Sequence, residues 1–344
     1  MKLFFVPILC LLLTFPSLFA AELNSFPGID LNSNDINNFD NSKNISSSNP
    51  TISDKFMLDL SNSVRSLLAG NETEGLGARL KNTITQEGVG VTKSFLEKFF
   101  PTVEISYSTG LYNKPTAGIL VVAPLSDKQD IKNTVFTQIS TFYTDNRTTL
   151  NLGLGYRRLE FDNKLLLGAN LFYDHEFPYD HQRTSFGLEA RTSVGEINFN
   201  EYWGISGWKE GRNNFEEKSL GGRDIEIGVP LPYMNWVKFY ARGFKWNGIE
   251  GESDIKGNDL SLQANLNGLT ISAGKRNYND LKDSEFLQIS YNLINDNPPQ
   301  KLEWISKEAY KFQSMENRRY DKVRRENIIV KQAKKGFSVT VKGT

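Results

Sequence analysis

The sequence predicts an all-β transmembrane barrel, a single antiparallel barrel of about twelve strands. Three patterns favour this fold class. Apolar and polar residues alternate along short segments between residues 102 and 293, which is the period of a sheet whose two faces meet different surroundings. Tyr and Trp lie near the ends of these segments, as in the aromatic girdles of membrane barrels. Short and long connections also alternate along the chain.

The composition narrows the function. The 344 residues hold 40 Lys and Arg and 40 Asp and Glu, so the formal net charge is zero and gives no case for a nucleic-acid partner. A single Cys and two His exclude a disulfide scaffold and Cys-based zinc sites. We expect no enzyme activity, no cofactor, and no catalytic or metal site.

The N-terminal 100 residues are expected to precede the barrel. Residues 1–20 carry a basic start, an apolar run with two prolines and small residues at the end, which is typical of a secretory signal peptide. Residues 21–54 are rich in Asn and Ser and predict a flexible linker. Apolar residues at helical spacing predict a periplasmic helical segment over residues 55–100.

Residues 101–294 are predicted to form the barrel. In the segment 224–229, Ile225, Ile227 and Val229 alternate with Asp224, Glu226 and glycine. The same alternation or a comparable apolar pattern predicts twelve strands of six to ten residues, and the longer ones approach the roughly 9–11 residues that cross a bilayer. They cover residues 102–111, 118–125, 134–143, 150–157, 165–173, 186–191, 196–203, 224–229, 237–242, 260–266, 269–274 and 287–293.

A soluble β-sandwich also alternates, and the connections favour a barrel over it. Residues 160–163, 192–195 and 267–268 form short turns after even strands, whereas residues 174–182, 204–222 and 245–259 form long loops after odd strands. The connection at residues 126–133 is an exception, because it follows an even strand but is longer than the other turns on that side. Since backbone polar groups in lipid must all be paired, the sheet is expected to close. An even number of strands then leaves both barrel termini on the periplasmic side.

Six segments in order resemble one family. The chain contains RTTLNLGLGY at 147–156, LGANLFYD at 167–174, QRTSFGLE at 182–189, SGW at 206–208, LPY at 231–233 and RYDKVRRENIIV at 319–330. These segments resemble the inverse autotransporter β-domain of the intimin and invasin family. The resemblance implies a twelve-stranded outer-membrane barrel that exports a C-terminal passenger through its pore.

The chain departs from the family pattern at both ends. No recognisable peptidoglycan-binding module precedes the barrel, and about a dozen residues follow the last motif, so we expect no large C-terminal passenger. The expected function is an outer-membrane barrel that translocates or anchors its own C-terminal segment. A surface-exposed adhesion or interaction protein and a passive outer-membrane pore remain the alternatives. Outer-membrane lipid, the export and barrel-assembly machinery, and a host or neighbour-cell surface ligand are the expected partners.

Residues 295–344 are predicted to form a C-terminal helix and linker in or near the pore. Residues 301–344 carry twelve Lys and Arg against five Asp and Glu, and apolar residues at helical spacing predict a helix near residues 303–317. We expect the basic residues to contact acidic side chains of the barrel interior, although a solvated periplasmic tail is the alternative. The candidates are Arg318, Arg319, Lys322, Arg324 and Arg325 in the tail and Glu189, Asp224 and Glu226 in the barrel.

Two loops hold the other polar candidates. Asp174, His175, Glu176, Asp180 and His181 fall in the predicted loop 174–182, where loop polarity explains them without a metal. An outer-membrane phospholipase would need a Ser and a His at lipid-interface depth, and neither His lies in a predicted strand. The loop 204–222 could contact a partner through Trp208, Lys209, Arg212 and Phe215. A variable surface loop is the simpler interpretation of the same residues.

Overall fold

The computed structural model describes residues 100–110, 114–211, 215–266, 268–295 and 303–334, all within the second of two compact units, residues 51–344. The predicted signal peptide, linker and helical segment lie outside the described residues, apart from residue 100. Within the described ranges, no helix has the length and apolar character needed to cross a membrane.

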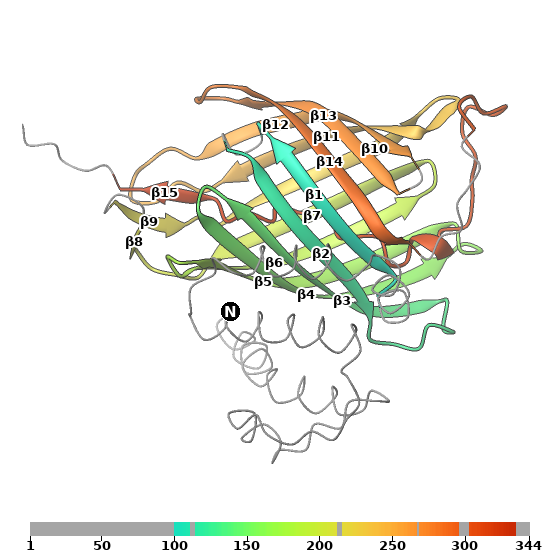
Figure 1. The fold of residues 1–344 in the computed structure, drawn as a ribbon, viewed down its shortest axis with the longest axis horizontal. Coiled ribbons are helices and arrows are strands. Elements are labelled where there is room, and N and C mark those ends of the chain that lie inside the picture. Colours follow the sequence, from blue (N-terminus) through green and yellow to red (C-terminus); the bar gives the residue numbers. More distant parts are fainter. Residues whose placement is uncertain (1–99, 111–113, 212–214, 267, 296–302, 335–344) are drawn as a thin grey trace, which may run out of the picture. The chain divides into compact units, whose positions relative to one another are not determined.

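Twelve strands form one closed antiparallel barrel (Figure 1), which confirms the predicted fold class and strand number. The barrel closes because β1 pairs with both β2 and β14, with Ile105 opposite Ile119 on one side and Tyr291 on the other. The barrel strands are β1 Thr102–Thr109, β2 Thr116–Pro124, β3 Asn133–Thr144, β4 Arg147–Glu160, β5 Leu165–Phe177, β6 His181–Thr192, β7 Gly195–Gly204, β10 Gly222–Leu231, β11 Met234–Trp246, β12 Ile255–Leu266, β13 Leu269–Tyr278 and β14 Ser284–Asn295.

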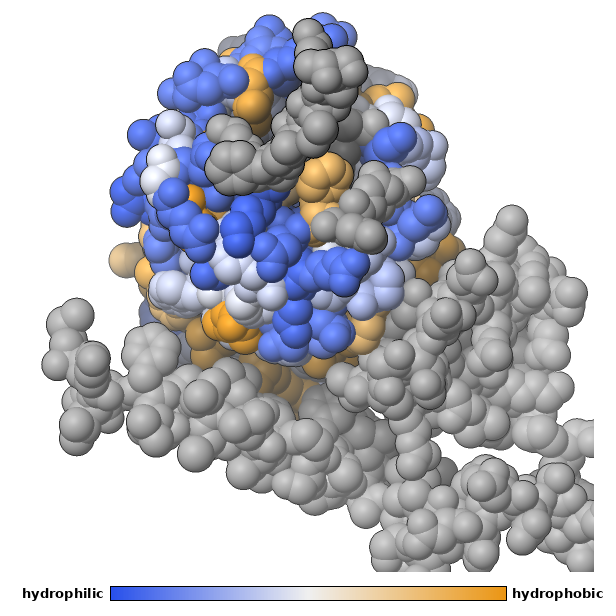
Figure 2. All heavy atoms as spheres, turned by 90° about the vertical axis from the view of Figure 1, so that its left-hand side faces the viewer, coloured by the Kyte–Doolittle hydropathy of each residue, from blue (hydrophilic) through white to orange (hydrophobic). Residues whose placement is uncertain are grey.

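The two ends of the barrel differ. At the turn end, where β1 begins and β14 ends, the connections include residues 161–164, 193–194 and 232–233. At the loop end, a second sheet of three short strands joins β8 Lys209–Glu210, β9 Glu216–Ser219 and β15 Lys331–Ala333 in the order β15-β9-β8. Figure 2 views this end and shows a surface covered mainly by hydrophilic residues.

The predicted loop 174–182 is wrong, because most of it is strand. β5 continues to Phe177 and β6 begins at His181, so only residues 178–180 connect them. The sequence hides this extension because polar residues occupy both faces there. Asp174 and Glu176 point inward and are 0% and 1% exposed, whereas His175 points outward and stacks on Phe177 with ring centroids 4.2 Å apart. Both His residues therefore lie in strands.

β10 shows how the alternation divides the two faces. Ile225, Ile227 and Val229 are 46%, 51% and 39% exposed on the outer face. Asp224 of the same strand points inward and is 3% exposed. A protein that folds in water places its side chains the other way round. The exposed apolar row and the buried acid together fit a barrel with lipid outside and a polar interior.

Aromatic side chains fill the barrel interior beside inward-facing glycines. A Cβ at Gly153 would lie 2.2 Å from the Phe172 ring, and a Cβ at Gly155 would lie 2.2 Å from the Phe136 ring. Both distances are far below van der Waals contact, so these positions require glycine while the rings stay in place. Phe136 and Phe172 pack with Leu120 and other buried residues in an apolar cluster inside the barrel.

Several, but not all, of the Tyr and Trp residues near strand ends lie on the outer face, where an aromatic girdle is expected. Tyr107, Tyr143, Tyr156, Trp203 and Tyr291 are 42% to 52% exposed on the outer face. Trp246 differs because it points inward, where it is 3% exposed and packs against Tyr202. Its position at the end of β11 places it on the inner row with Phe244 and Arg242.

Candidate functional site

The chain between residues 303 and 315 follows the turn end of the barrel. Ser306 N donates to Tyr233 O at 2.8 Å, Ser193 Oγ donates to Lys311 O at 2.8 Å, and Met315 N donates to Asn163 O at 2.6 Å. These backbone groups bond to the turns between strands and not to each other. The predicted helix near residues 303–317 is therefore wrong, and only a 3₁₀ turn, η2 Glu316–Arg318, forms there.

Met315 marks the point where the chain enters the barrel. Its side chain is fully buried against Leu159 and Leu166, which close the turn end of β4 and β5. Farther along, Tyr320 and Val323 join the apolar cluster around Phe136 and Phe172. We call residues 315–333 the tail segment; it follows the inner wall from the turn end to β15 at the loop end.

Inward side chains of the barrel bind the main chain of the tail segment. Three buried arginines donate to its carbonyl oxygens: Arg157 to residues 319 and 321 at 2.7 and 2.6 Å, Arg191 to residue 322 at 3.2 Å, and Arg183 to residues 326 and 328 at 2.7 and 3.2 Å. Asn151 and Asn200 donate to the carbonyl oxygens of residues 327 and 324 at 2.9 and 3.0 Å.

Two backbone N–H groups of the tail segment are bound by inward side chains as well. Val323 N donates to Gln138 Oε1 at 2.8 Å, and Glu326 N donates to Tyr202 Oη at 2.7 Å. The tail segment is thus held by groups that every amino acid carries, because these contacts involve its peptide units. Buried peptide groups require such partners.

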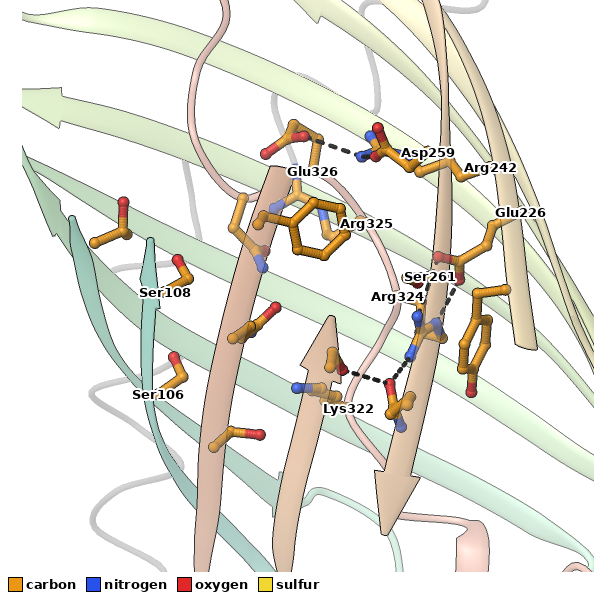
Figure 3. Close-up of a pocket in the computed structure, with 18 of the residues that line it drawn as sticks. Ser106, Ser108, Glu226, Arg242, Asp259, Ser261, Lys322, Arg324, Arg325 and Glu326 are labelled. Atoms are coloured by element: carbon orange, nitrogen blue, oxygen red, sulfur yellow. Dashed lines mark hydrogen bonds and ion pairs between the residues drawn. The ribbon is translucent and has the colours of Figure 1, made fainter. Parts of the chain in front are cut away.

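Acidic side chains of the barrel hold the basic side chains of the tail segment (Figure 3). Lys322 Nζ lies 2.6 Å from Glu104 Oε1, and Arg324 forms a two-point contact with Glu226. Arg325 pairs with Asp174 through two hydrogen bonds of 2.8 and 2.7 Å, and both side chains are fully buried. Arg318 Nη2 lies 3.3 Å from Glu196 Oε2.

The predicted site residues are brought together only in part. Arg324 contacts Glu226, but Glu189 pairs with the barrel residues Arg157 and Arg191, and Asp224 pairs with Arg242. Arg319 donates to the carbonyl oxygen of Asp130 at 3.1 Å and contacts none of the three predicted acids. Sequence reasoning placed Asp174 in a loop, and it missed Glu104, Glu196 and the buried arginines of the wall. The arginines could have been identified from the alternation along β4 and β6, which places Arg157, Arg183 and Arg191 on the inward face.

At the loop end, β15 adds to the small sheet. Lys331, Gln332 and Ala333 pair with Ser219, Lys218 and Glu217 of β9. Gln332 also exchanges two hydrogen bonds of 3.0 Å with the backbone of Ile249. The exit of the tail segment is therefore fixed by strand pairing on one side and by the β11–β12 connection on the other.

A charged cluster attaches β9 to the barrel. Arg147 donates to both carboxylate oxygens of Glu217 at 2.8 and 2.9 Å and to Glu176 at 2.8 Å. Burial favours the neutral form of Glu217, but contacts from His181 and from the Arg147 guanidinium outweigh it and lower the pKa of Glu217 to about 2. Lys331 of the tail segment pairs with Glu176 in the same cluster.

The predicted surface-loop residues lie at the loop end. Trp208 is half-buried, donates its Nε1–H to Glu250 Oε1 at 2.8 Å, and lies near the ammonium groups of Lys218 and Lys334 at 5.8 and 5.5 Å from its ring centre. Lys209 is exposed in β8, and Phe215 is 49% exposed. Arg212 lies outside the described residues.

A cavity beside the tail segment is lined by both charged and uncharged polar groups, and Glu104, Asp259 and Arg276 of the barrel are among the charged ones. It has a volume of about 170 Å³ and lies between the tail segment and inward residues of β12, β13, β14, β1 and β2. Hydroxyl and amide side chains form most of the wall on these strands. They are Ser106, Ser108, Thr116, Ser261, Gln263, Thr270, Ser272, Gln288 and Ser290.

A closed antiparallel barrel with an apolar outer face, a polar interior and turns at one end defines an outer-membrane β-barrel. The chain is a protein of the Gram-negative outer membrane. It belongs to the inverse autotransporter β-domain family, whose sequence profile matches residues 61–327.

Relatives and solved structures agree with this assignment. Intimin of Escherichia coli O127:H6 is 28% identical over 257 residues, which cover 69% of this chain and 26% of intimin. Invasin of Yersinia enterocolitica is 31% identical over 137 residues, covering 38% of this chain and 16% of invasin. The inverse autotransporter adhesin YeeJ of Escherichia coli K12 is 26% identical over 215 residues, 59% of this chain and 9% of that protein. The chain thus spans about a quarter or less of these relatives.

A solved chain from work on the mechanism behind the in-meso crystallization of membrane proteins shares the fold. It superposes with a TM-score of 0.58 and 22% identity, covering 68% of this chain and the whole of that chain. The likeness extends over the barrel fold alone.

Proposed function

We propose that this outer-membrane barrel exports and anchors its own C-terminal segment, with the turn end in the periplasm and the loop end at the cell surface. The observation that carries the proposal is the continuous binding of the tail segment, from buried Met315 at the turn end to β15 at the loop end. No catalytic step is part of this function.

The chemistry of the contacts suits a polypeptide as cargo. Arg157, Arg183, Asn151 and Asn200 donate to carbonyl oxygens, so they can hold a chain of any sequence. Ion pairs such as Arg325 with Asp174 then hold the final position, because a buried charge pair is costly to separate. A barrel built to pass small solutes would have no need for main-chain partners along its wall.

The proposed orientation follows from the strand number and the turns. Twelve strands place the first residue of β1 and the last residue of β14 at the same end, which carries the shorter turns. Bacterial outer-membrane barrels have short periplasmic turns and longer surface loops. We infer that the chain reaches the membrane through the general export and barrel-assembly machinery, which are its proposed protein partners.

The location of a tag placed after Thr344 tests the proposal. Antibody or protease access to this tag on intact cells supports export, and protection of the tag until the outer membrane is opened contradicts it. Two matched tags serve as references: one within residues 247–254 at the loop end, expected to be accessible, and one directly after Gly268 at the turn end, expected to be protected.

Adhesion is the second candidate function. Trp208 between Lys218 and Lys334, together with exposed Phe215, forms an aromatic and cationic surface at the loop end. Aromatic and cationic side chains are enriched in protein contacts, and the partner would be an anionic host or neighbour-cell surface. A loss of cell attachment in the W208A/F215A double variant, with normal tag exposure, supports adhesion. Unchanged attachment contradicts it.

A passive pore is tested by conductance. The cavity of about 170 Å³ beside the tail segment is lined by charged and uncharged polar groups. Deleting residues 303–344 is expected to raise single-channel conductance in a planar bilayer if the tail segment fills the pore. An equal conductance with and without these residues contradicts the exporter proposal and favours a pore that is open throughout.

A further inference from the structure

The tail segment makes two kinds of contact with the barrel, and they have different consequences. Its carbonyl oxygens are bound by Arg157, Arg183, Asn151 and Asn200, and these contacts stay the same when the chain slides by one residue. Contacts to its side chains change with every step. The position at which the tail segment stops must therefore come from side-chain contacts.

One side-chain contact has the opposite sign to the others. Glu326 is the one acidic residue between Lys322 and Lys331 in the sequence, and it is 3% exposed. Its Oε2 lies 3.1 Å from Arg242 Nη1 (Figure 3). The same oxygen lies 3.7 Å from Arg276 Nη2. An acid of the tail segment thus faces two cations of the wall, while the neighbouring tail cations face wall acids.

The wall acids near these two arginines are already bound to wall donors. Asp259 receives two hydrogen bonds from Arg276, of 2.7 and 2.8 Å. Asp224 receives hydrogen bonds from Arg242 at 2.7 Å, Tyr202 at 2.9 Å and Asn200 at 2.8 Å. Arg242 Nη1, which also lies 3.4 Å from Asp259 Oδ2, donates to Glu326 Oε2 at 3.1 Å, and Arg276 Nη2 lies nearby, so the two arginines direct N–H donors at the tail segment.

Sliding the chain by one residue is unfavourable in both directions. One direction brings Arg325 to the position of Glu326, where it meets Arg242 and Arg276. The other direction brings Glu326 to the position of Arg325, where it meets the fully buried carboxylate of Asp174. Like charges at side chains that are at most 12% exposed repel more strongly than at the surface, because less solvent screens them.

We propose that the contact of Glu326 with Arg242 and Arg276 fixes the register at which the tail segment stops in the barrel. Glu326 is a positioning residue: the main-chain contacts permit movement, and the alternation of charge at residues 324–326 selects one position. This inference rests on the proposed function, since a register matters for a chain that has moved through the barrel.

Cysteine labelling at the exit tests the register. The chain has one Cys, at position 10, within the predicted signal peptide, so single Cys variants report cleanly. Ile329→Cys is placed where the side chain is 2% exposed, and Lys334→Cys where it is 54% exposed. In the otherwise wild-type folded protein, a membrane-impermeant maleimide is expected to label position 334 quickly and position 329 slowly.

Glu326→Lys is expected to move this boundary. Replacing the buried pair by like charges shifts the equilibrium by more than about 100-fold, so labelling at 329 should accelerate at least about tenfold, or labelling at 334 should slow, depending on the direction of the slide. Glu316→Lys is the matched control, because it makes the same charge change on the same segment at the turn end, with no expected effect. Adding Arg276→Gln to Glu326→Lys removes one like charge and should partly restore the wild-type pattern.

The outcomes separate the two proposals. An unchanged boundary in Glu326→Lys, with a heat-modifiable folded barrel, overturns the register proposal. If that variant does not fold, Glu326→Gln decides: faster labelling at 329 supports the proposal and unchanged labelling overturns it. If position 334 is labelled in detergent but in no variant on intact cells, the export proposal fails, while the register result in detergent still stands.

Discussion

Arg325 and Asp174 lie 151 residues apart in the sequence and form a two-point ion pair, with hydrogen bonds of 2.8 and 2.7 Å, in which both side chains are fully buried. Arg183 and Asn151 of the barrel bind the same carboxylate at 2.8 Å each. Asp174 therefore joins the tail segment to three strands, β4, β5 and β6.

Breaking this pair is expected to release the tail segment. Arg325→Ala leaves Asp174 with one fewer cation at a fully buried position, and the loss of one partner of a buried pair costs about 3–5 kcal/mol. Labelling at Ile329→Cys, or proteolysis of the tail, measures the release. Lys245→Ala removes a partner of Asp254 in a pair whose side chains are 36% and 29% exposed, and should have a much smaller effect because solvent screens the pair. Equal effects of the two substitutions would contradict the buried-pair explanation.

The outer face can be tested by a single charge. Ile227 is 51% exposed near the middle of β10, where lipid is expected. Ile227→Arg should destabilise the inserted barrel by about 2–4 kcal/mol, the cost of a charged side chain at the bilayer midplane. The folded fraction in lipid vesicles, read from heat-modifiable gel mobility over a urea series, measures the effect. Ile227→Leu should leave that fraction unchanged, and tolerance of the arginine would count against a lipid-facing position.

Inward glycine is expected to be required beside the aromatic rings. Gly153→Ala places a methyl group 2.2 Å from the Phe172 ring, so the ring must move, which costs about 1–3 kcal/mol by analogy with overpacked cores. Urea unfolding of the barrel should report this loss. Gly243→Ala adds a methyl group where nothing lies within 4 Å and serves as the control. A double variant with Phe172→Leu should recover part of the loss.

Acid should loosen the small sheet only at very low pH. The pKa of Glu217 is lowered to about 2 from an ordinary value of 4.5, so the ionised carboxylate stabilises the folded state above pH 4.5 and this contribution is lost as the pH falls toward 2. Pepsin, which acts in acid, should leave residues 215–219 intact at pH 4 and cleave them near pH 2. Glu217→Gln should be cleaved at both values, and cleavage of the wild type at pH 4 would contradict the prediction.

Sequence patterns predict this fold well because the barrel separates two solvents residue by residue. The alternation of Ile225, Ile227 and Val229 with polar neighbours predicts the position of β10 correctly. The same method fails for residues 174–177, where Asp174 and Glu176 are inward and His175 is outward. Polar residues on both faces remove the signal, and the partners that make these acids inward are distant Arg325 and Lys331.

The tail shows a second limit. Apolar residues at helical spacing in 303–317 predict a helix, yet Ser306 and Met315 donate their N–H groups to the turns at Tyr233 and Asn163. Tertiary partners that are distant in the sequence replaced the local hydrogen bonds. The acids Glu104 and Glu196 were missed for the same reason, because alternation identifies a face but not which groups meet across it.

The hydrogen bonds to carbonyl oxygens of the tail segment have an evolutionary consequence. Their donors are Arg157, Arg183, Asn151 and Asn200. Each of the twenty amino acids carries the same carbonyl oxygen. Substitutions in the tail segment therefore leave these hydrogen bonds intact as long as the residues that form the ion pairs are kept. Under the proposed export function, a different C-terminal segment would need matching charges at only a few positions, and the barrel itself could stay unchanged.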